Sequence, residues 1–442
     1  MLRHGFRHPA RVVPLAFFGA IVLGTALLML PVSHAGDGGT HWLTALFTAT
    51  SAVCVTGLAV VDTPTHWSTF GQVVIMVLFQ LGGFGMMTGA TLLSLLVAGR
   101  LRLGTRLIAQ AETRSTGLGN VPELVRLVVL VTAGIELALA AILAARLHFA
   151  YGEPWGAAAW HGLFHSISAF NNAGFSTWSD SLTRFATDPL VLVPVMGAIV
   201  LGGLGFPVLQ ELRREPLHWA RWSVHTKITL LGTAILFTGG MAMILLYEWH
   251  ATLAPFATPA KVLAAAFHSV SARTAGFNVV DVGAMQQETL AVHYVLMFIG
   301  GGSAGTAGGI KVTTFLLLGF VVWAEVRGSR DTIAFRRRIS SETQRQALSV
   351  VLLGLTVLAI ATLALESVTD EPLNILMFEV ISAFATVGLS TGITGSLPPT
   401  GQGILIVLMY VGRVGTITVA TALALRSHHL SYRYPEERPI VG

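Results

Sequence analysis

Four short segments of small and polar residues interrupt long apolar stretches of the chain, and each ends in a glycine. They read LFTATSAVCVTGL (46–58), LFHSISAFNNAGF (163–175), AFHSVSARTAGF (266–277) and MFEVISAFATVGL (377–389). In each, Ser-Ala begins four residues after a phenylalanine, and Leu or Phe follows the last glycine. Glycine tolerates backbone conformations that other residues avoid, so such segments can turn their carbonyl oxygens inward. A ring of carbonyl oxygens can replace the water around a dehydrated cation without any charged side chain.

A second glycine motif follows each segment inside the next apolar stretch. The motifs are LGGFG (81–85), LGGLG (201–205), IGGGSAG (299–305) and VGRVG (411–415). Their glycines at 82, 202, 300 and 412 lie 25, 28, 24 and 24 residues after the preceding segment's last glycine. Two motifs at nearly constant spacing indicate a fourfold internal repeat. The third segment is one residue shorter than the others and carries Arg273.

The elements that must position these segments are apolar helices. The first run of each repeat is expected at 12–32, 123–148, 223–249 and 344–366, and the second run at 68–98, 188–212, 290–325 and 402–426. About 20 helical residues cross roughly 30 Å of hydrocarbon. The pattern predicts an all-α membrane protein of four fused units (helix, re-entrant pore helix plus filter, helix) around one pseudo-fourfold pore, with eight spanning helices.

The repeat boundaries follow from these runs. We expect repeats at 1–99, 100–215, 216–340 and 341–426, and a cytoplasmic tail at 427–442. The basic start, apolar run and small-residue exit at Ser33-His34-Ala35 would also fit a cleaved signal peptide. Because the repeat requires this run as a helix, we favour a retained first span.

Composition and charge agree with a membrane protein. The chain of 442 residues is 53% hydrophobic and 11% charged, with mean hydropathy +0.70, whereas soluble domains carry roughly 25% charged residues. Its single cysteine, Cys54, excludes an intrachain disulfide. With both termini inside, 21 of the 27 Lys and Arg residues fall on inner segments, a positive-inside pattern that explains the basic charge without nucleic acid. The remaining basic residues are Arg146, Arg184, Lys261 and Arg273 on outer segments, and Lys311 and Arg413 within the bundle.

Non-helical backbone at membrane depth persists only where protein buries it or where it lines a watery path. Four such segments around one axis would form a ring, and each short helix before a segment would aim its negative C-terminal end at the centre. The alternative is that the glycines merely ease helix packing. Helix packing explains a single glycine well, but it explains poorly why glycine recurs at the same position in all four segments.

Thr386-Val387-Gly388-Leu389 resembles the Thr-Val-Gly-Tyr filter of potassium channels. The four fused units resemble the Trk/Ktr/HKT potassium transporter superfamily over nearly the whole chain. The KtrB branch is most similar, because no extra helix pair precedes the first unit and the tail reads RYPEERPIVG. The resemblance implies the ion-translocating subunit of a potassium uptake system. The filter residues that it implies are Val55, Thr56, Gly57, Asn172, Ala173, Gly174, Thr274, Ala275, Gly276, Thr386, Val387 and Gly388. Glycine at all four filter positions favours K⁺, and the three degenerate segments imply looser discrimination against Na⁺.

The sequence GGGSAGTAGG (300–309) interrupts the second run of the third repeat, and a helix would lose stability at each glycine. The resemblance implies an intramembrane gating loop below the filter. Arg413 stands where the other repeats have Gly83, Gly203 and Gly301. We expect it to latch the loop, the alternative being an ion pair with a glutamate. The expected gate residues are Gly300, Gly301, Gly302, Ser303, Gly305, Thr306, Gly308, Gly309, Lys311 and Arg413.

Several other polar residues have a functional and a structural interpretation, or only one of these. Lys311 is either part of the gate or a snorkelling lysine, and Glu136 is either a coupling-ion site or a packing hydrogen bond. Glu379 is expected to tune the outer vestibule, whereas His165 and His268 are expected to be packing residues rather than metal ligands. Cys54 is expected to pack beside the filter.

The resemblance also implies partners. These are the lipid bilayer of a bacterial cell membrane, a second copy in a homodimer, and a cytosolic ring of nucleotide-binding (KtrA-like RCK) regulatory subunits. The basic segment 327–345 and the tail would dock that ring, or the arginines would only face lipid headgroups. No cofactor is expected; K⁺ is the transported ion, and Na⁺ is a possible coupling or activating ion.

Three other functions are alternatives to potassium uptake. One is a Na⁺ or Na⁺/K⁺ transporter of the same fold, and another is a secondary transporter of small solutes with broken helices. The third, an enzyme with a phosphate loop at 302–314, is rejected because Ile310 separates Gly309 from Lys311.

Overall fold

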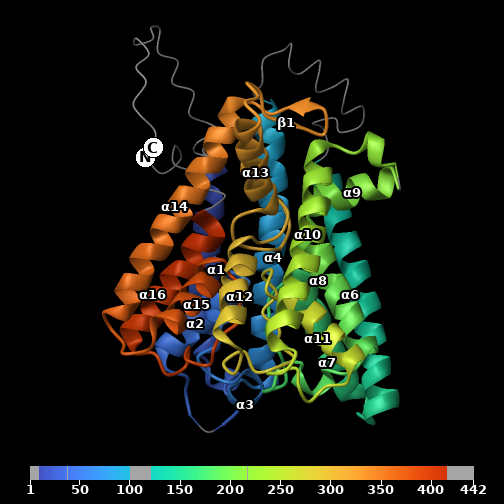
Figure 1. The fold of residues 1–442 in the computed structure, drawn as a ribbon. Helices are drawn as coiled ribbons and strands as arrows, with labels where there is room; N and C mark the ends of the chain where they lie inside the picture. Colours follow the sequence, from blue (N-terminus) through green and yellow to red (C-terminus); the bar gives the residue numbers. More distant parts are fainter. Residues whose placement is uncertain (1–8, 37, 100–120, 217, 416–442) are drawn as a thin grey trace.

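The computed structural model describes residues 9–36, 38–99, 121–216 and 218–415. The predicted tail at 427–442, the end of the last apolar run at 416–426 and the basic segment 100–120 lie outside the described residues. Figure 1 shows the long helices α4 (Thr69–Gly99), α6 (Val121–Tyr151), α10 (Val224–Glu248) and α14 (Ser341–Glu366) running along the molecule. The short helices α2 (Trp42–Val53), α7 (Trp155–Asn171), α11 (Thr258–Ser271) and α15 (Leu373–Phe384) lie toward one end.

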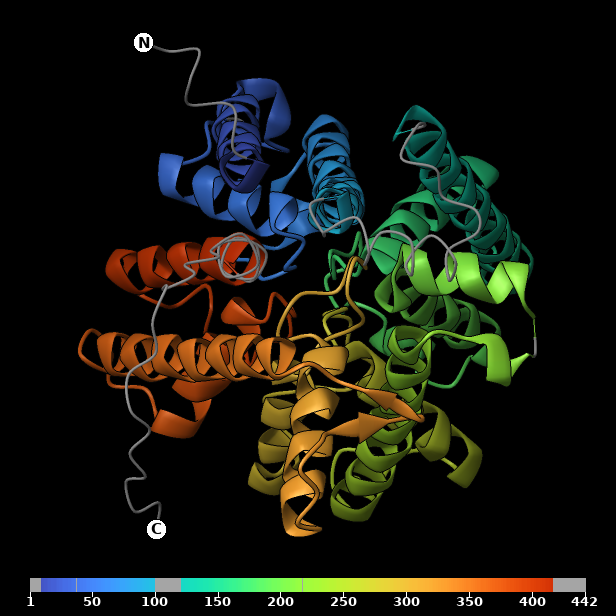
Figure 2. The same ribbon diagram turned by 90° about the horizontal axis from the view of Figure 1, so that it is seen from above.

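The main helices fall into four consecutive groups. The groups are α1 (Pro9–Leu28), α2 (Trp42–Val53) and α4 (Thr69–Gly99); α6 (Val121–Tyr151), α7 (Trp155–Asn171), α8 (Pro189–Leu204) and α9 (Phe206–Arg214); α10 (Val224–Glu248), α11 (Thr258–Ser271), α12 (Gln287–Phe298) and α13 (Val312–Val326); and α14 (Ser341–Glu366), α15 (Leu373–Phe384) and α16 (Pro399–Tyr410). From above, these groups surround a common centre in chain order (Figure 2). The predicted all-α membrane fold is confirmed.

The other elements are small. They are α3 (Thr63–His66), the 3₁₀ turns Pro31–Ser33, Thr183–Phe185 and Trp219–Arg221, a π-helical turn at Val411–Gly415, and strands β1 (Ile333–Ala334) and β2 (Arg337–Arg338). The two strands pair antiparallel, with Ile333 opposite Arg338. This hairpin is a minor departure from an all-helical chain.

The four short helices are set by local sequence and by burial. Proline stands at the start of α7, α11 and α15, where the missing N–H costs no helical hydrogen bond. Each short helix also carries the phenylalanine of the repeat motif, and all four rings are fully buried: Phe47, Phe164, Phe267 and Phe378. The motif phenylalanine therefore ties each short helix into the core.

The outer surface of the long helices is apolar. Among the described residues, parts of α4 and α6 and all of α10 and α14 are long and apolar enough to span a membrane, with α8 and α9 a fifth span if that bent pair is counted as one. Leu137, Leu246 and Leu363 are each more than 60% exposed. Side chains of this kind face lipid rather than water, as a multi-pass membrane protein requires. The total of eight spans stays a prediction.

The second run of the second repeat is not one helix, contrary to expectation. The chain turns by 101° between α8 and α9 at Gly205, whose φ is +91°. A Cβ atom there would collide with the carbonyl oxygen of Ser303, and the N–H of Phe206 donates to Ala304 O at 3.3 Å. The positive φ of Gly205 and the proline in the first turn of α9 favour a break here, and the loop of the third repeat packs into the bend. The predicted break at 300–309 is present between α12 and α13.

Candidate functional site: four converging hairpins

The last glycines of the four motif segments pack against one another in a closed cycle. A Cβ atom on Gly57 would collide with Ala173 O. On Gly174 it would lie 2.8 Å from Ala275 O, and on Gly276 2.5 Å from Val387 O. On Gly388 it would collide with Thr56 O, which closes the cycle. The structure therefore brings the predicted filter segments together around one axis, with the carbonyl oxygen of each middle residue at a contact between neighbours.

The same backbone recurs in all four segments. The first residue of each has positive φ, with values of 57° at Val55, 59° at Asn172, 76° at Thr274 and 50° at Thr386. The last glycine has φ between 71° and 92° in every segment. A β-branched residue such as valine or threonine rarely adopts this conformation. Strained backbone repeated at four equivalent positions points to a functional constraint.

The motif serine holds each segment in this shape. Its carbonyl oxygen accepts the N–H of the middle residue in every repeat, at 2.7–2.9 Å. The hydroxyls of Ser51 and Ser382 accept the N–H of the filter glycine at 3.0 and 3.1 Å, and those of Ser168 and Ser271 donate to the carbonyl after it. These serines are functional residues that their type alone does not reveal, although they recur at the same place in every motif.

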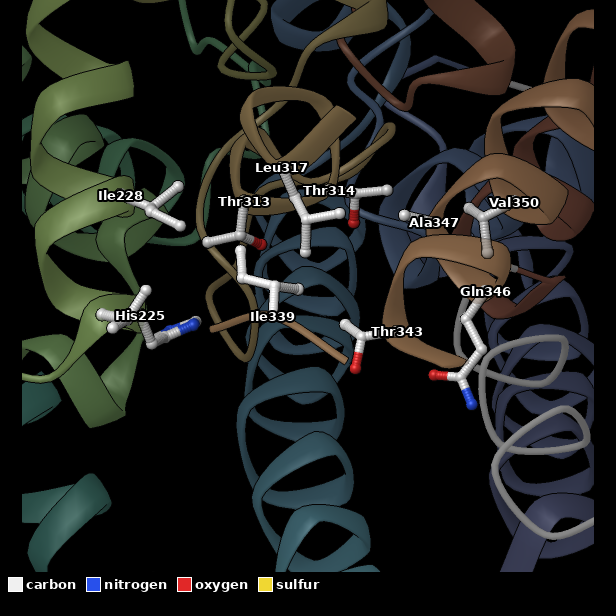
Figure 3. A pocket seen from close by; sticks show the side chains of 11 residues that line it. His225, Ile228, Thr313, Thr314, Leu317, Ile339, Thr343, Gln346, Ala347 and Val350 are labelled. Carbon is white, nitrogen blue, oxygen red and sulfur yellow. The ribbon is translucent and has the colours of Figure 1, made fainter. Parts of the chain in front are cut away.

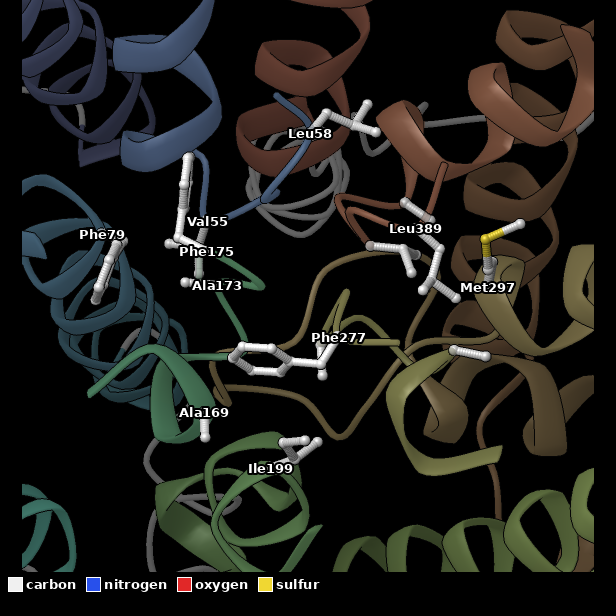
Figure 4. Packing of buried hydrophobic residues seen from close by; sticks show 14 of the residues in the cluster. Val55, Leu58, Phe79, Ala169, Ala173, Phe175, Ile199, Phe277, Met297 and Leu389 are labelled. Carbon is white, nitrogen blue, oxygen red and sulfur yellow. The ribbon is translucent and has the colours of Figure 1, made fainter. Parts of the chain in front are cut away.

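The apolar residue after each glycine anchors the outward limb of the hairpin. These residues are Leu58, Phe175, Phe277 and Leu389, and none exposes more than 2% of its surface. Figure 4 shows them packed behind the segments, beside side chains of neighbouring helices such as Phe79 and Met297. The segments therefore rest on a packed apolar layer.

In repeats two to four, the residue after the motif phenylalanine also stabilises the hairpin through its side chain; in the first repeat the hydroxyl of Thr48 has no partner among the described residues. His165 lies 3.0 Å from the hydroxyl of Ser176, and Nε2 of His268 accepts the N–H groups of Val279 and Val280 at 3.3 Å. In the fourth repeat the carboxylate of Glu379 accepts hydrogen bonds from Ser390 Oγ, Thr391 N and Oγ1, and Thr394 Oγ1. The two histidines are hydrogen-bonded packing residues, as predicted, and the described residues hold no cluster of three His, Cys, Asp or Glu side chains.

A vestibule of about 440 Å³ opens on one side of the ring. Its floor includes all four filter glycines, and its wall includes the carboxylates of Asp62 and Asp281. Asp62 accepts the hydroxyls of Thr65 and Ser179 at 2.7 Å. The entrance therefore combines carboxylate charge with exposed backbone.

The glycine-rich loop packs against the opposite side of the ring. Gly302 N donates to Gly203 O at 2.7 Å, and Thr306 N donates to Gly202 O at 3.1 Å. The Thr306 hydroxyl lies 3.3 Å from the side-chain amide of Asn172, and a Cβ on Gly308 would collide with Thr386 Oγ1. The loop thus contacts the filter segments of repeats two and four.

Two cationic side chains, the buried Arg413 and the partly buried Lys311, hold this loop. Nη1 of the fully buried Arg413 donates to Thr306 O at 2.5 Å, and Nζ of Lys311 donates to Ala307 O at 2.6 Å. No ion pair joins Arg413 to a carboxylate within the part of the chain that the structure describes. Arg413 is therefore held by a carbonyl oxygen of the loop rather than by a carboxylate among the described residues.

Arg273 is buried against the glycine-rich loop, although the sequence places it on an outer segment. It is 8% exposed, and Nη2 donates to Gly300 O at 3.1 Å, at the start of the loop. It lies on the same side of the ring as the loop because it precedes the positive-φ residue Thr274, where the hairpin turns. Cys54, which precedes Val55 in the same way, is buried, as predicted.

Glu136 takes part in a buried network between helices. Its carboxylate accepts Nε2 of Gln80 and Nδ2 of Asn171, both at 3.1 Å. Asn171 immediately precedes the filter residue Asn172, so the network links α4 and α6 to the second segment. This geometry fits the packing interpretation of Glu136.

A further cavity of about 380 Å³ lies between α10, α13 and α14 (Figure 3). Its lining includes Thr313 and Leu317 in the first turns of α13, just after the loop, with Ile228 on α10 and Val350 on α14. A smaller cavity of about 70 Å³ reaches Ile310, the last loop residue but one. The chain that leaves the loop is therefore flanked by open space.

Known proteins resemble this chain over almost its whole length. Residues 12–432 match the family model TrkH, described as a cation transport protein. The chain is 40% identical to the Ktr system potassium uptake protein B of Bacillus subtilis, over 98% of this chain and 97% of the relative. It is 34% identical to the potassium/sodium uptake protein NtpJ of Enterococcus hirae, over 98% of this chain and 97% of the relative.

The crystal structure of the potassium transporter TrkH from Vibrio parahaemolyticus has a similar fold. The TM-score is 0.73 at 18% identity, covering 94% of this chain and 85% of that one. The family match over almost the whole chain and the 40% identity together show that this chain belongs to the TrkH family of cation transport proteins.

Proposed function

We propose that this chain is the ion-translocating subunit of a potassium uptake system. K⁺ sheds its water at a ring made by the four filter segments, crosses it singly, and passes a loop that Arg413 holds closed. The observation that carries this proposal is the closed cycle of contacts among Gly57, Gly174, Gly276 and Gly388. Four carbonyls at such a ring are the ligands that a dehydrated monovalent cation needs.

The electrostatics of the surroundings support a cation. The four short helices end at the filter segments, so their negative C-terminal ends adjoin the ring. Asp62 and Asp281 add negative charge at the vestibule. The buried hydroxyls of Thr56 and Thr386 have no hydrogen-bond partner among the described residues. Buried hydroxyls are seldom left unpaired, so these two are available to an ion or to water.

The loop and its cations support a gate. A guanidinium within the bundle repels a passing cation, and its hydrogen bond to Thr306 O keeps the loop against the ring. Burial of this charge without a carboxylate is costly in a membrane protein and marks a functional residue by default. The cavities beside Ile310 and Thr313 give the loop space to move into.

Sodium transport by the same ring is the second candidate. It is favoured by the similarity to NtpJ, which is named a potassium/sodium uptake protein. The proposed preference for K⁺ rests on glycine at all four filter positions. Transport of small organic solutes has no comparable support, and a binding screen on the purified protein would test it.

We further propose a multi-pass protein of the bacterial cell membrane with both termini in the cytoplasm. It would act as a homodimer docked on a cytosolic ring of nucleotide-binding, KtrA-like subunits. The similarity to a protein of the Ktr system supports a multi-component transporter. The exposed arginines 336–338 on the β1–β2 hairpin are the proposed docking surface. Co-purification of the two components, lost on reversal of these charges, is the test.

Rescue of a bacterium that lacks its own K⁺ uptake tests the central proposal. The unaltered chain should restore growth at low external K⁺, whereas Gly388→Ser should not, because a side chain there collides with Thr56 O. Gly392→Ser is the matched control, since Gly392 also has positive φ (101°) but has nothing within 4 Å of its Cβ position. No rescue by a well-expressed unaltered chain, or equal rescue by both variants, would contradict the filter assignment.

A further inference from the structure

The residue before the positive-φ position differs in character among the four repeats. It is Cys54, Asn171, Arg273 or Ala385. Only the third repeat has a cationic residue, Arg273, at this position. The glycine-rich loop at 300–309 also belongs to the third repeat. The charge and the loop thus occur in the same repeat.

Arg273 is committed to the loop by its contacts. Nη2 donates to Gly300 O at 3.1 Å and lies 3.4 Å from Thr233 Oγ1 on α10. No carboxylate forms an ion pair with Arg273 in the described ranges. A buried guanidinium without a counter-charge is costly, and here carbonyl and hydroxyl oxygens are its recorded partners.

The same arginine connects the loop to the filter. It lines a cavity of about 20 Å³ together with Asn172, Gly203 and Gly301. Its Nε is buried and has no partner among the described residues. The cavity is large enough for one water molecule. Arg273 therefore lies between the second filter segment and the first loop residues.

Gly300 is also the point at which the loop closes on itself. Its N–H donates to Ile310 O at 2.9 Å, and Ile310 N donates to Phe298 O at 3.1 Å. This pairing fixes the two ends of the loop side by side. Arg273 holds the carbonyl of Gly300, whereas Arg413 holds Thr306 near the far end of the loop.

We propose that Arg273 is a positioning residue that fixes the start of the loop, its root, at Gly300. When Arg413 releases Thr306, only the loop residues after Gly300 then move. This inference rests on the proposed gating function. The two arginines then have separate duties: Arg413 sets how often the loop opens, and Arg273 sets which part of it moves.

Thiol labelling of the loop tests the proposal independently of transport. The background is the full chain with Cys54→Ala, and the probe is Ser303→Cys labelled by a membrane-impermeant methanethiosulfonate in proteoliposomes. Arg273→Gln should raise the labelling rate about tenfold, because the loss of a charged hydrogen bond shifts an equilibrium by roughly that factor. Arg273→Lys should restore most of the protection, and Arg184→Gln, at an exposed outer arginine, should change nothing.

Two outcomes would overturn the inference. One is an unchanged rate in Arg273→Gln, and the other is a rate that Arg273→Lys fails to restore while both variants elute as folded protein. If Arg273→Gln does not fold, Thr233→Val is measured instead and should raise the rate two- to threefold, by loss of one weak hydrogen bond; no rise contradicts the proposal. Failure of the proposed function is distinct, since it would appear as absent K⁺ uptake by the unaltered chain.

Discussion

Arg413 and Thr306 are 107 residues apart in the chain, yet a hydrogen bond of 2.5 Å joins the guanidinium of one to the carbonyl oxygen of the other. The bond links the fourth repeat to the loop of the third. Because the loop also contacts the filter segments, this one contact couples the last helix to the ring.

Removal of the latch should open the pathway. In Arg413→Ala the loop loses a charged hydrogen bond worth about 1.5–3 kcal/mol, and the repelling charge disappears. We expect K⁺ or Rb⁺ influx into proteoliposomes to rise roughly tenfold or more, and deletion of 300–309 to have the same direction of effect. In Arg413→Lys, which keeps the charge, the influx should rise less. Unchanged influx in both Arg413→Ala and the loop deletion would refute the gate.

The motif serine of the fourth repeat should matter for selectivity. Ser382→Ala leaves the N–H of Gly388 without its 3.1 Å partner, at a cost of about 1–3 kcal/mol. We expect a lower K⁺/Na⁺ uptake ratio with near-normal expression. Ser396→Ala, at an exposed serine later in the same repeat, is the control. Equal uptake ratios in the two variants would show that the hydroxyl does not shape the ring.

Glu379 should stabilise the outward limb of the fourth hairpin. Glu379→Gln replaces a carboxylate that accepts four hydrogen bonds by an amide with a single acceptor oxygen. We expect a loss of unfolding free energy on the order of 2 kcal/mol and weaker K⁺ binding, measured by thermal unfolding with and without K⁺. The exposed Glu366→Gln should leave both unchanged. If the Glu379→Gln protein is as stable as the unaltered chain, Glu379 does not stabilise the fourth hairpin.

Glu136 should behave as a structural group. Glu136→Ala leaves Nε2 of Gln80 without its recorded acceptor and removes one of the three acceptors of Asn171 Nδ2. We expect it to lower the unfolding free energy by roughly 2 kcal/mol. Glu136→Gln should keep transport with the same dependence on external Na⁺, and Glu288→Ala, at an exposed glutamate, should be neutral. A Na⁺ dependence that disappears in Glu136→Gln would instead identify a coupling-ion site.

Local repetition made much of the architecture predictable. The Ser-Ala and glycine motifs recur at fixed spacing, so the four hairpins and the short helices before them could be read from the sequence. The break at 300–309 was visible for the same reason, since a run of glycines cannot continue a helix.

Contacts between repeats left no such signal. The sequence Gly205-Phe206-Pro207 is a local signal of a helix break, but nothing local indicates that Ser303 of another repeat packs into the bend. The partners of Arg413 and Arg273 are carbonyl oxygens, which every residue has, so composition cannot point to them. The sequence predicts Arg273 on an outer segment because membership of a hairpin does not say on which side of the ring a residue lies.

The central claim is that the four segments bind a dehydrated monovalent cation on their common axis. Diffraction from crystals grown in Tl⁺ as a K⁺ substitute tests it most directly, because Tl⁺ scatters anomalously. The account predicts an anomalous peak on the axis, bounded by the carbonyl oxygens of Thr56, Ala173, Ala275 and Val387. Anomalous peaks only away from that axis, with the ring intact and vacant, would contradict it.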